Sequence, residues 1–154
     1  MELFHTSPAK ITEINNHGRF GSFLFFAGAA YRMAAGSVIT YKTELNEAEI
    51  ISARRLFWHD DAEKLSGLVA ELAGRLGCDA DTAEALIEET TSIYDVADDL
   101  GIDAEDLADI SWDIQHISAK AACVLGFRGV AVSDEQGASF MINMIGHEAE
   151  LVEA

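Results

Sequence analysis

The chain has 154 residues, 49% of them hydrophobic, and a formal net charge of −17. This length and apolar content exclude a disordered chain and predict a single domain over residues 1–154 that buries roughly two thirds of its unfolded surface. The net charge argues against direct binding of nucleic acid, because phosphate would be repelled, and no run approaches the roughly 18 apolar residues of a membrane span.

The first third of the chain predicts three strands. The run Leu3–Ser7 is apolar at its start and ends in a histidine and two hydroxyls, and Pro8 then stops strand pairing. Phe20–Phe26 reads as a second strand, and Ala29 begins a helix-like stretch. β-branched residues within Ser37–Glu44 favour a third strand.

The middle of the chain predicts helices. Asn46 is a good N-cap for a helix through Phe57, with Glu49 completing a capping-box pattern. Apolar residues then repeat at helical spacing from Leu65 to Leu76, and Gly77 provides a C-cap. Asp79 begins the next helix, and Asp103 caps another that runs up to Gly126.

The last third predicts a strand hairpin, with Gly129–Ser133 returning as Ala138–Ile142. The fold class is therefore α+β, with a small mixed or antiparallel sheet built from the two chain ends and a helical insertion over about residues 46–122. Because short strands are stable only in a sheet of three or more, we expect the two ends to pair, so that His5 and Asp134 face one cleft.

Negative charge is concentrated in the middle of the chain. Residues Asp60–Asp113 hold 17 acidic and two basic residues, giving −15, and the remainder holds 27 − 17 = 10 acidic and 10 − 2 = 8 basic residues, giving −2. Solvated helix faces explain such a block, and an electrostatic docking surface for a basic partner is the alternative. The two cysteines, Cys78 and Cys123, are far apart and form no metal pattern with the five histidines, so we expect reduced thiols and no metal site.

Two segments together resemble a known family. Phe4-His5-Thr6-Ser7 near the start, and Leu125–Val130 leading to Asp134-Glu135-Gln136-Gly137 near the end, resemble the small phage-encoded anti-CRISPR ADP-ribosyltransferases of type I-F systems. These belong to the His-Tyr-Asp/Glu class of ADP-ribosyltransferases. The resemblance covers roughly the first and last 45 residues, and it implies an enzyme that uses NAD as the ADP-ribose donor and needs no metal.

The resemblance implies a catalytic carboxylate at Asp134, with Glu135 as the rival, because adjacent strand residues point to opposite faces. Read from the residues alone, Asp134–Gly137 favours a polar hairpin turn in which Gly137 supplies a positive φ.

The resemblance also assigns cofactor contacts. His5 would hydrogen-bond the adenosine-side ribose, Thr6 and Ser7 would approach the nicotinamide carboxamide, and Tyr31 would stack on nicotinamide, with Tyr41 as the substitute. The family's commoner first motif has glycine where Thr6 stands. The remaining candidates are two arginines for the pyrophosphate and two aromatic residues that either line the pocket or belong to the core: Arg19, Arg32, Phe20 and Phe25.

The implied function is mono-ADP-ribosylation of a protein in the cytoplasm of a bacterial host. The target would be the large subunit of the type I-F CRISPR surveillance complex that recognises the motif beside the DNA target (the PAM), and modification would block DNA binding. Two alternatives stay open: an acidic nucleic-acid mimic that binds stoichiometrically, and a free NAD glycohydrolase. Neither direct nucleic-acid binding nor a membrane is expected.

Overall fold

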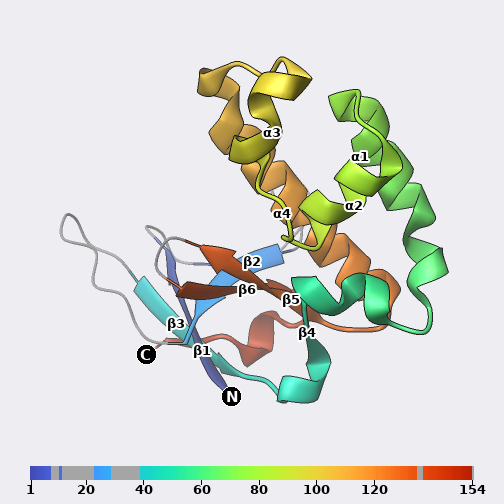
Figure 1. Cartoon of the computed structure of the whole chain (residues 1–154). Coiled ribbons are helices and arrows are strands. Elements are labelled where there is room, and N and C mark those ends of the chain that lie inside the picture. The colour runs from blue at the N-terminus through green and yellow to red at the C-terminus, as the bar shows by residue number, and fades with distance from the viewer. Residues whose placement is uncertain (8–10, 12–22, 29–38, 135–136, 154) are drawn as a thin grey trace.

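A computed structural model describes residues 1–7, 11, 23–28, 39–134 and 137–153. Within these residues the strands form one mixed sheet in the order β4-β5-β6-β2-β1-β3-β7 (Figure 1). Every neighbouring pair is antiparallel except β4 and β5, which are parallel. The predicted α+β fold, with a sheet that joins the two chain ends, is confirmed. The strand bounds are β1 Glu2–Ser7, β2 Phe23–Ala27, β3 Ile39–Glu44, β4 Ile50–Ser52, β5 Gly129–Asp134, β6 Gly137–Asn143 and β7 Val152–Glu153.

Within the described residues, helices α1 to α4 form a lobe beside the sheet, and the longest of them, α4, runs from this lobe down to the strands (Figure 1). Gly77 ends α1 at φ +68°, as predicted, and the Asp79 carboxylate accepts a 2.7 Å bond from the Thr82 amide at the start of α2. Asp103 makes no side-chain cap bond and precedes a short 3-10 turn (Ala104–Asp106), which contradicts the predicted cap. The helix bounds are α1 Ser66–Leu76, α2 Ala80–Ile87, α3 Ile93–Leu100 and α4 Leu107–Val124.

The predicted helix from Asn46 to Phe57 is wrong. Asn46 does form the capping box with Glu49, but it caps only a 3-10 turn, η1 (Glu47–Glu49). The chain then extends as β4 and turns again through η2 (Ala53–Trp58). The β-branched pair Ile50-Ile51 prefers extended backbone, and the parallel ladder with β5 stabilises it there.

The sheet carries a hydrophobic core on each face. On one face, Phe23, Val130, Val132 and Met141 pack with the buried residues of the helices. On the other face, Leu3, Phe26, Leu45, Ile142 and Met144 form a smaller core. α4 is therefore the element that joins the helical lobe to the sheet.

Arg128 fixes the base of the β5–β6 hairpin. Its guanidinium donates to the Asn143 carbonyl and to the Glu150 carboxylate, both at 3.1 Å, and its amide donates to the Glu49 carbonyl at 2.8 Å. The segments before β4 and after β6 are thus held at one point. None of the helices in the described ranges has both the length and the apolar character of a membrane span.

Candidate active site

His5 lies on the sheet face that carries the smaller core. Its ring stands 5.6 Å from the ring of Phe26, and its Nδ1 is 2.6 Å from the Phe25 carbonyl oxygen, to which it donates in the matching tautomer. Burial lowers the pKa of His5, and the bond to the Phe25 carbonyl opposes this shift. The imidazole is therefore neutral near pH 7 and held in one orientation.

Tyr41, the substitute for Tyr31, lies directly beside this histidine. The ladder between β1 and β3 pairs His5 with Tyr41, so the two side chains share a face. Tyr41 is 4% exposed, and its hydroxyl accepts a 2.9 Å hydrogen bond from the Ile11 amide. The tyrosine thus anchors the start of the segment that follows β1.

The predicted cofactor contacts on β1 and β2 are divided between the two faces of the sheet. Thr6 alternates with His5 and Ser7, so it belongs to the face toward the helices. Phe25 packs against the core on that helix side, while its neighbour Phe26 belongs to the core beneath His5. The sheet brings Thr6 and Phe25 to one side and His5 and Tyr41 to the other.

Asp134 is the last residue of β5, paired with Gly137 across the hairpin. Two strands, β6 and β2, separate β5 from β1. Three interstrand steps of about 4.8 Å place the two strands roughly 14 Å apart. The other predicted site residues lie outside the described residues: Arg19, Phe20, Tyr31, Arg32 and Glu135.

α4 contributes a histidine that the sequence interpretation missed. The ring of His116 meets that of Phe23, at the start of β2, edge-to-face at 5.5 Å. Burial, and then Lys120, lower the pKa of His116, and the carboxylates of Asp113 and Glu71 oppose the shift. The helix therefore carries a partly buried titratable group beside the start of β2.

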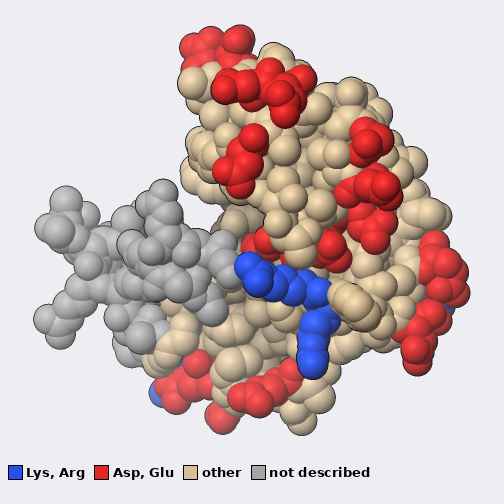
Figure 2. Space-filling view, viewed as in Figure 1, with Lys and Arg blue, Asp and Glu red and all other residues tan. Residues whose placement is uncertain are grey.

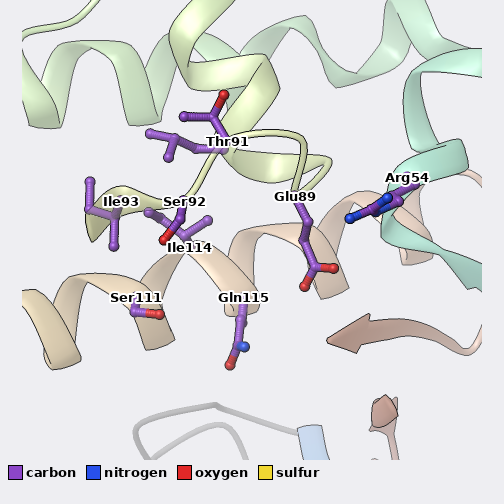
Figure 3. Close-up of a pocket in the computed structure, with 9 residues that line it drawn as sticks. Arg54, Glu89, Thr91, Ser92, Ile93, Ser111, Ile114 and Gln115 are labelled. Carbon is purple, nitrogen blue, oxygen red and sulfur yellow. The ribbon is translucent and has the colours of Figure 1, made fainter. Parts of the chain in front are cut away.

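A cavity of about 210 Å³ with a mixed polar and apolar lining adjoins α4 on the side of the helical lobe (Figure 3). Arg54 from η2 and Glu89 from the turn after α2 point toward the same space, across from Gln115 of α4 (Figure 3). Ser92, Thr91 and Ser111 add hydroxyls, and Leu86, Ile93 and Ile114 add apolar surface.

Glu89 is held in the left-handed region at φ +63°, a conformation that non-glycine residues seldom adopt. Such strain clusters at functional sites. Drug-sized ligands occupy pockets of roughly 300–1,000 Å³, so this smaller cavity suits a single ring or one side chain. A guanidinium, a carboxylate and hydroxyls can bind a small group that both donates and accepts hydrogen bonds. Sequence reasoning missed Arg54 and Glu89 because neither lies in a recognisable motif.

Comparison with known proteins decides the family. Residues 1–149 match the family described as anti-CRISPR type I-F ADP-ribosyltransferase AcrIF11. The chain belongs to this family. A solved structure described as "Crystal structure of an anti-CRISPR protein" is similar, with a TM-score of 0.56 and 25% sequence identity, over 92% of this chain and 88% of that one. The comparison with curated protein sequences gave no significant match.

The protein is therefore an ADP-ribosyltransferase of the anti-CRISPR type, as the two terminal motifs predicted. This family's reaction implies NAD as the ADP-ribose donor, and its role implies contact with components of a CRISPR-Cas system. Among the described residues, no group of three or more histidines, cysteines or acidic residues is arranged to hold a metal ion.

Proposed function

We propose that this AcrIF11-family protein is an NAD-dependent mono-ADP-ribosyltransferase that modifies the PAM-recognising large subunit of the type I-F surveillance complex. It acts in the cytoplasm of the bacterial host and blocks DNA binding by that complex. The observation that carries the proposal is the family match over residues 1–149, which spans both terminal motifs and the helical insertion between them.

The proposed reaction replaces one bond to the ribose by another. The C–N bond between nicotinamide and C1′ of the ribose breaks, and neutral nicotinamide leaves with the electron pair. A nucleophilic side chain of the target forms the new bond to C1′ and loses a proton to solvent or to a nearby base. Asp134 stabilises the oxocarbenium-like transition state, by its negative charge and by a hydrogen bond from a ribose hydroxyl.

The cofactor lies across the centre of the sheet in this proposal. His5 binds the adenosine-side ribose with its neutral ring, on the face that carries the smaller core. Ser7 contacts the carboxamide from that face, and Thr6, whose side chain lies on the opposite face, contacts it through its backbone. Tyr31 stacks on nicotinamide, and Glu135 is the alternative catalytic carboxylate. The further proposed cofactor contacts are Arg19, Phe20 and Arg32, whereas Phe25 packs in the core on the face opposite His5 and supports the sheet.

ADP-ribosylation is well suited to disabling a DNA-binding surface. The adduct adds bulk and two negative charges where the target must meet phosphate. Since phosphate contacts supply much of the affinity for DNA, the loss of a few of them weakens binding severely. A catalytic inhibitor also acts below one copy per target.

The test is incubation of the purified protein with labelled NAD and a type I-F surveillance complex, followed by mass spectrometry of every subunit. We expect one adduct, on the large subunit, that is absent with Asp134→Ala and retained with Glu135→Ala. If adducts persist with Asp134→Ala and disappear with Glu135→Ala, the catalytic carboxylate is Glu135 and not Asp134. No adduct on any subunit would refute the proposed target.

The acidic surface favours one alternative, a stoichiometric mimic of nucleic acid. Acidic side chains lie over much of the helical lobe in Figure 2, in keeping with the −15 carried by Asp60–Asp113. A mimic would inhibit without NAD, would not depend on Asp134, and would fail as ionic strength rises. A free NAD glycohydrolase would instead consume NAD at full rate with no target present.

A further inference from the structure

An open groove of about 580 Å³ runs along β4 and η2, apart from the cavity beside α4. β4 is the outermost strand at this end of the described sheet, so the groove lies at the edge of the sheet. Apolar residues line it together with one arginine and one carboxylate, among them Ile50, Trp58, His59, Phe127, Arg55 and Glu47. The edge of His59 meets the ring of Phe127 at 5.8 Å, which fixes one side of the groove.

Trp58 is 85% exposed although its turn is firmly anchored. Ala53 and Leu56 of the same 3-10 turn are fully buried in the main core, so the turn cannot rotate to cover the indole. A single exposed apolar side chain needs no explanation. This one forms part of a groove together with an arginine, and tryptophan and arginine are the residues that most often dominate the binding energy of protein interfaces.

The charge of this region is opposite to that of its surroundings. Arg54 and Arg55 are adjacent and exposed, and Figure 2 shows basic side chains in the middle of this face with acidic ones on either side. A partner whose basic groups contact the acidic surface needs a negatively charged group opposite Arg54 and Arg55. Nucleic acid does not fit, because the phosphates beyond the first contact would meet carboxylates.

The two neighbouring arginines of η2 border different hollows. Arg55 lines the groove, and the preceding residue, Arg54, lines the separate cavity beside α4. The groove therefore offers a partner Arg55 and Trp58, and not Arg54.

We propose that the β4–η2 groove docks an extended segment of the protein target. An apolar side chain of this segment packs on Trp58, and a carboxylate of the segment pairs with Arg55. This inference rests on the proposed function, since it gives the transferase a surface for recognising its substrate. Extended segments that bind along an edge strand are a recurring mode of protein recognition.

The test compares Trp58→Ala and Arg55→Glu with matched variants of the helical lobe. Tyr94→Ala removes an aromatic ring that is 59% exposed, and Lys64→Glu reverses an exposed basic charge. Each variant is assayed for the Kd for NAD, for the rate of target modification, and for direct binding to the surveillance complex. We expect the groove variants to lower kcat/KM for the complex about 30-fold, as at an interfacial hot spot. The Kd for NAD stays unchanged, and the control variants behave like wild type.

Three outcomes would overturn the inference. Wild-type modification rates in Trp58→Ala and Arg55→Glu would show that the groove does not recognise the target. A weakened Kd for NAD in these variants would assign the groove to the dinucleotide. An equal loss in Tyr94→Ala would assign the effect to general surface contact. If the wild-type protein modified no subunit, the proposed function would fail, and the binding measurement alone would still decide whether Trp58 contacts the complex.

Discussion

Gly129 is the position where a single methyl group should most damage the hairpin that carries Asp134. A Cβ added there would lie 2.4 Å from the Met141 carbonyl oxygen and 2.5 Å from the Ile142 side chain, against an ordinary contact of 3.4 Å or more. The shortfall to the oxygen is 3.4 − 2.4 = 1.0 Å. That oxygen belongs to β6, which is paired on both sides, so it cannot move unless the β5 or β2 ladder also moves.

Gly129→Ala should therefore cost about 3 kcal/mol of unfolding free energy, the upper end for overpacking a core. With a urea m-value of roughly 2 kcal/mol/M, the unfolding midpoint should fall by about 1.5 M. The same displacement moves Asp134, so we also expect the rate of ADP-ribose transfer to fall by more than the loss of folded protein accounts for.

Gly67→Ala is the matched control. Gly67 lies in α1, and a Cβ there would meet no atom within 4 Å. Since alanine favours a helix over glycine by about 1 kcal/mol, this variant should unfold at the wild-type midpoint or above it. The reasoning fails if Gly129→Ala keeps the wild-type midpoint, or if both variants lose the same stability.

Three further outcomes follow from the described contacts. Because burial lowers the pKa of His5 and of His116, the unfolded chain binds more protons than the folded one as the pH falls. The contribution of the two neutral rings to the unfolding free energy should therefore be fully present above about pH 6.5 and decline below it. Urea titrations from about pH 5 to 8 should show a shallower decline for His5→Gln than for wild type. Tyr41→Phe should lower the unfolding free energy by about 1 kcal/mol, because the Ile11 amide loses its acceptor, and an unchanged urea midpoint would contradict this. Ser118→Ala should cost about 1–2 kcal/mol in the same measurement, because the buried hydroxyl donates 2.7 Å to the Ile87 carbonyl and links α4 to the end of α2.

The sequence predicted those elements that are stabilised by residues close together in the chain. Gly77 and Asp79 end one helix and begin the next as their residue types require, and the alternation around Val130 and Val132 gives the hairpin. β4 was missed because its partner among the described strands is β5, far along the chain, and nothing near Ile50 indicates that pairing. The Asn46 capping box was real but stabilised one turn only.

The composition of the site was beyond sequence reasoning for a similar reason. The pairing of His5 with Tyr41 depends on the register of β1 and β3. The cavity depends on Arg54 and Glu89 meeting from separate turns, and neither turn carries a motif. The terminal motifs identified the family, and side-chain alternation along β1 follows from its being a strand, but neither indicated which face the helices would cover.

The helical insertion is tied closely to the strands that carry the proposed chemistry. α4 packs on β5 and β6 through its buried small residues, including Ala119 and Ala122, and its Ser118 bonds to the end of α2. The Glu49 carbonyl of η1 accepts a hydrogen bond from the Arg128 amide just before β5, and Leu56 of η2 lies in the core that contains residues of the same strands. A target held in the β4–η2 groove would therefore be fixed relative to β5, so docking would orient the acceptor before the bond between nicotinamide and ribose breaks. Productive transfer then depends on docking geometry as well as on Asp134, which is why binding to the complex and NAD cleavage should be separable by mutation.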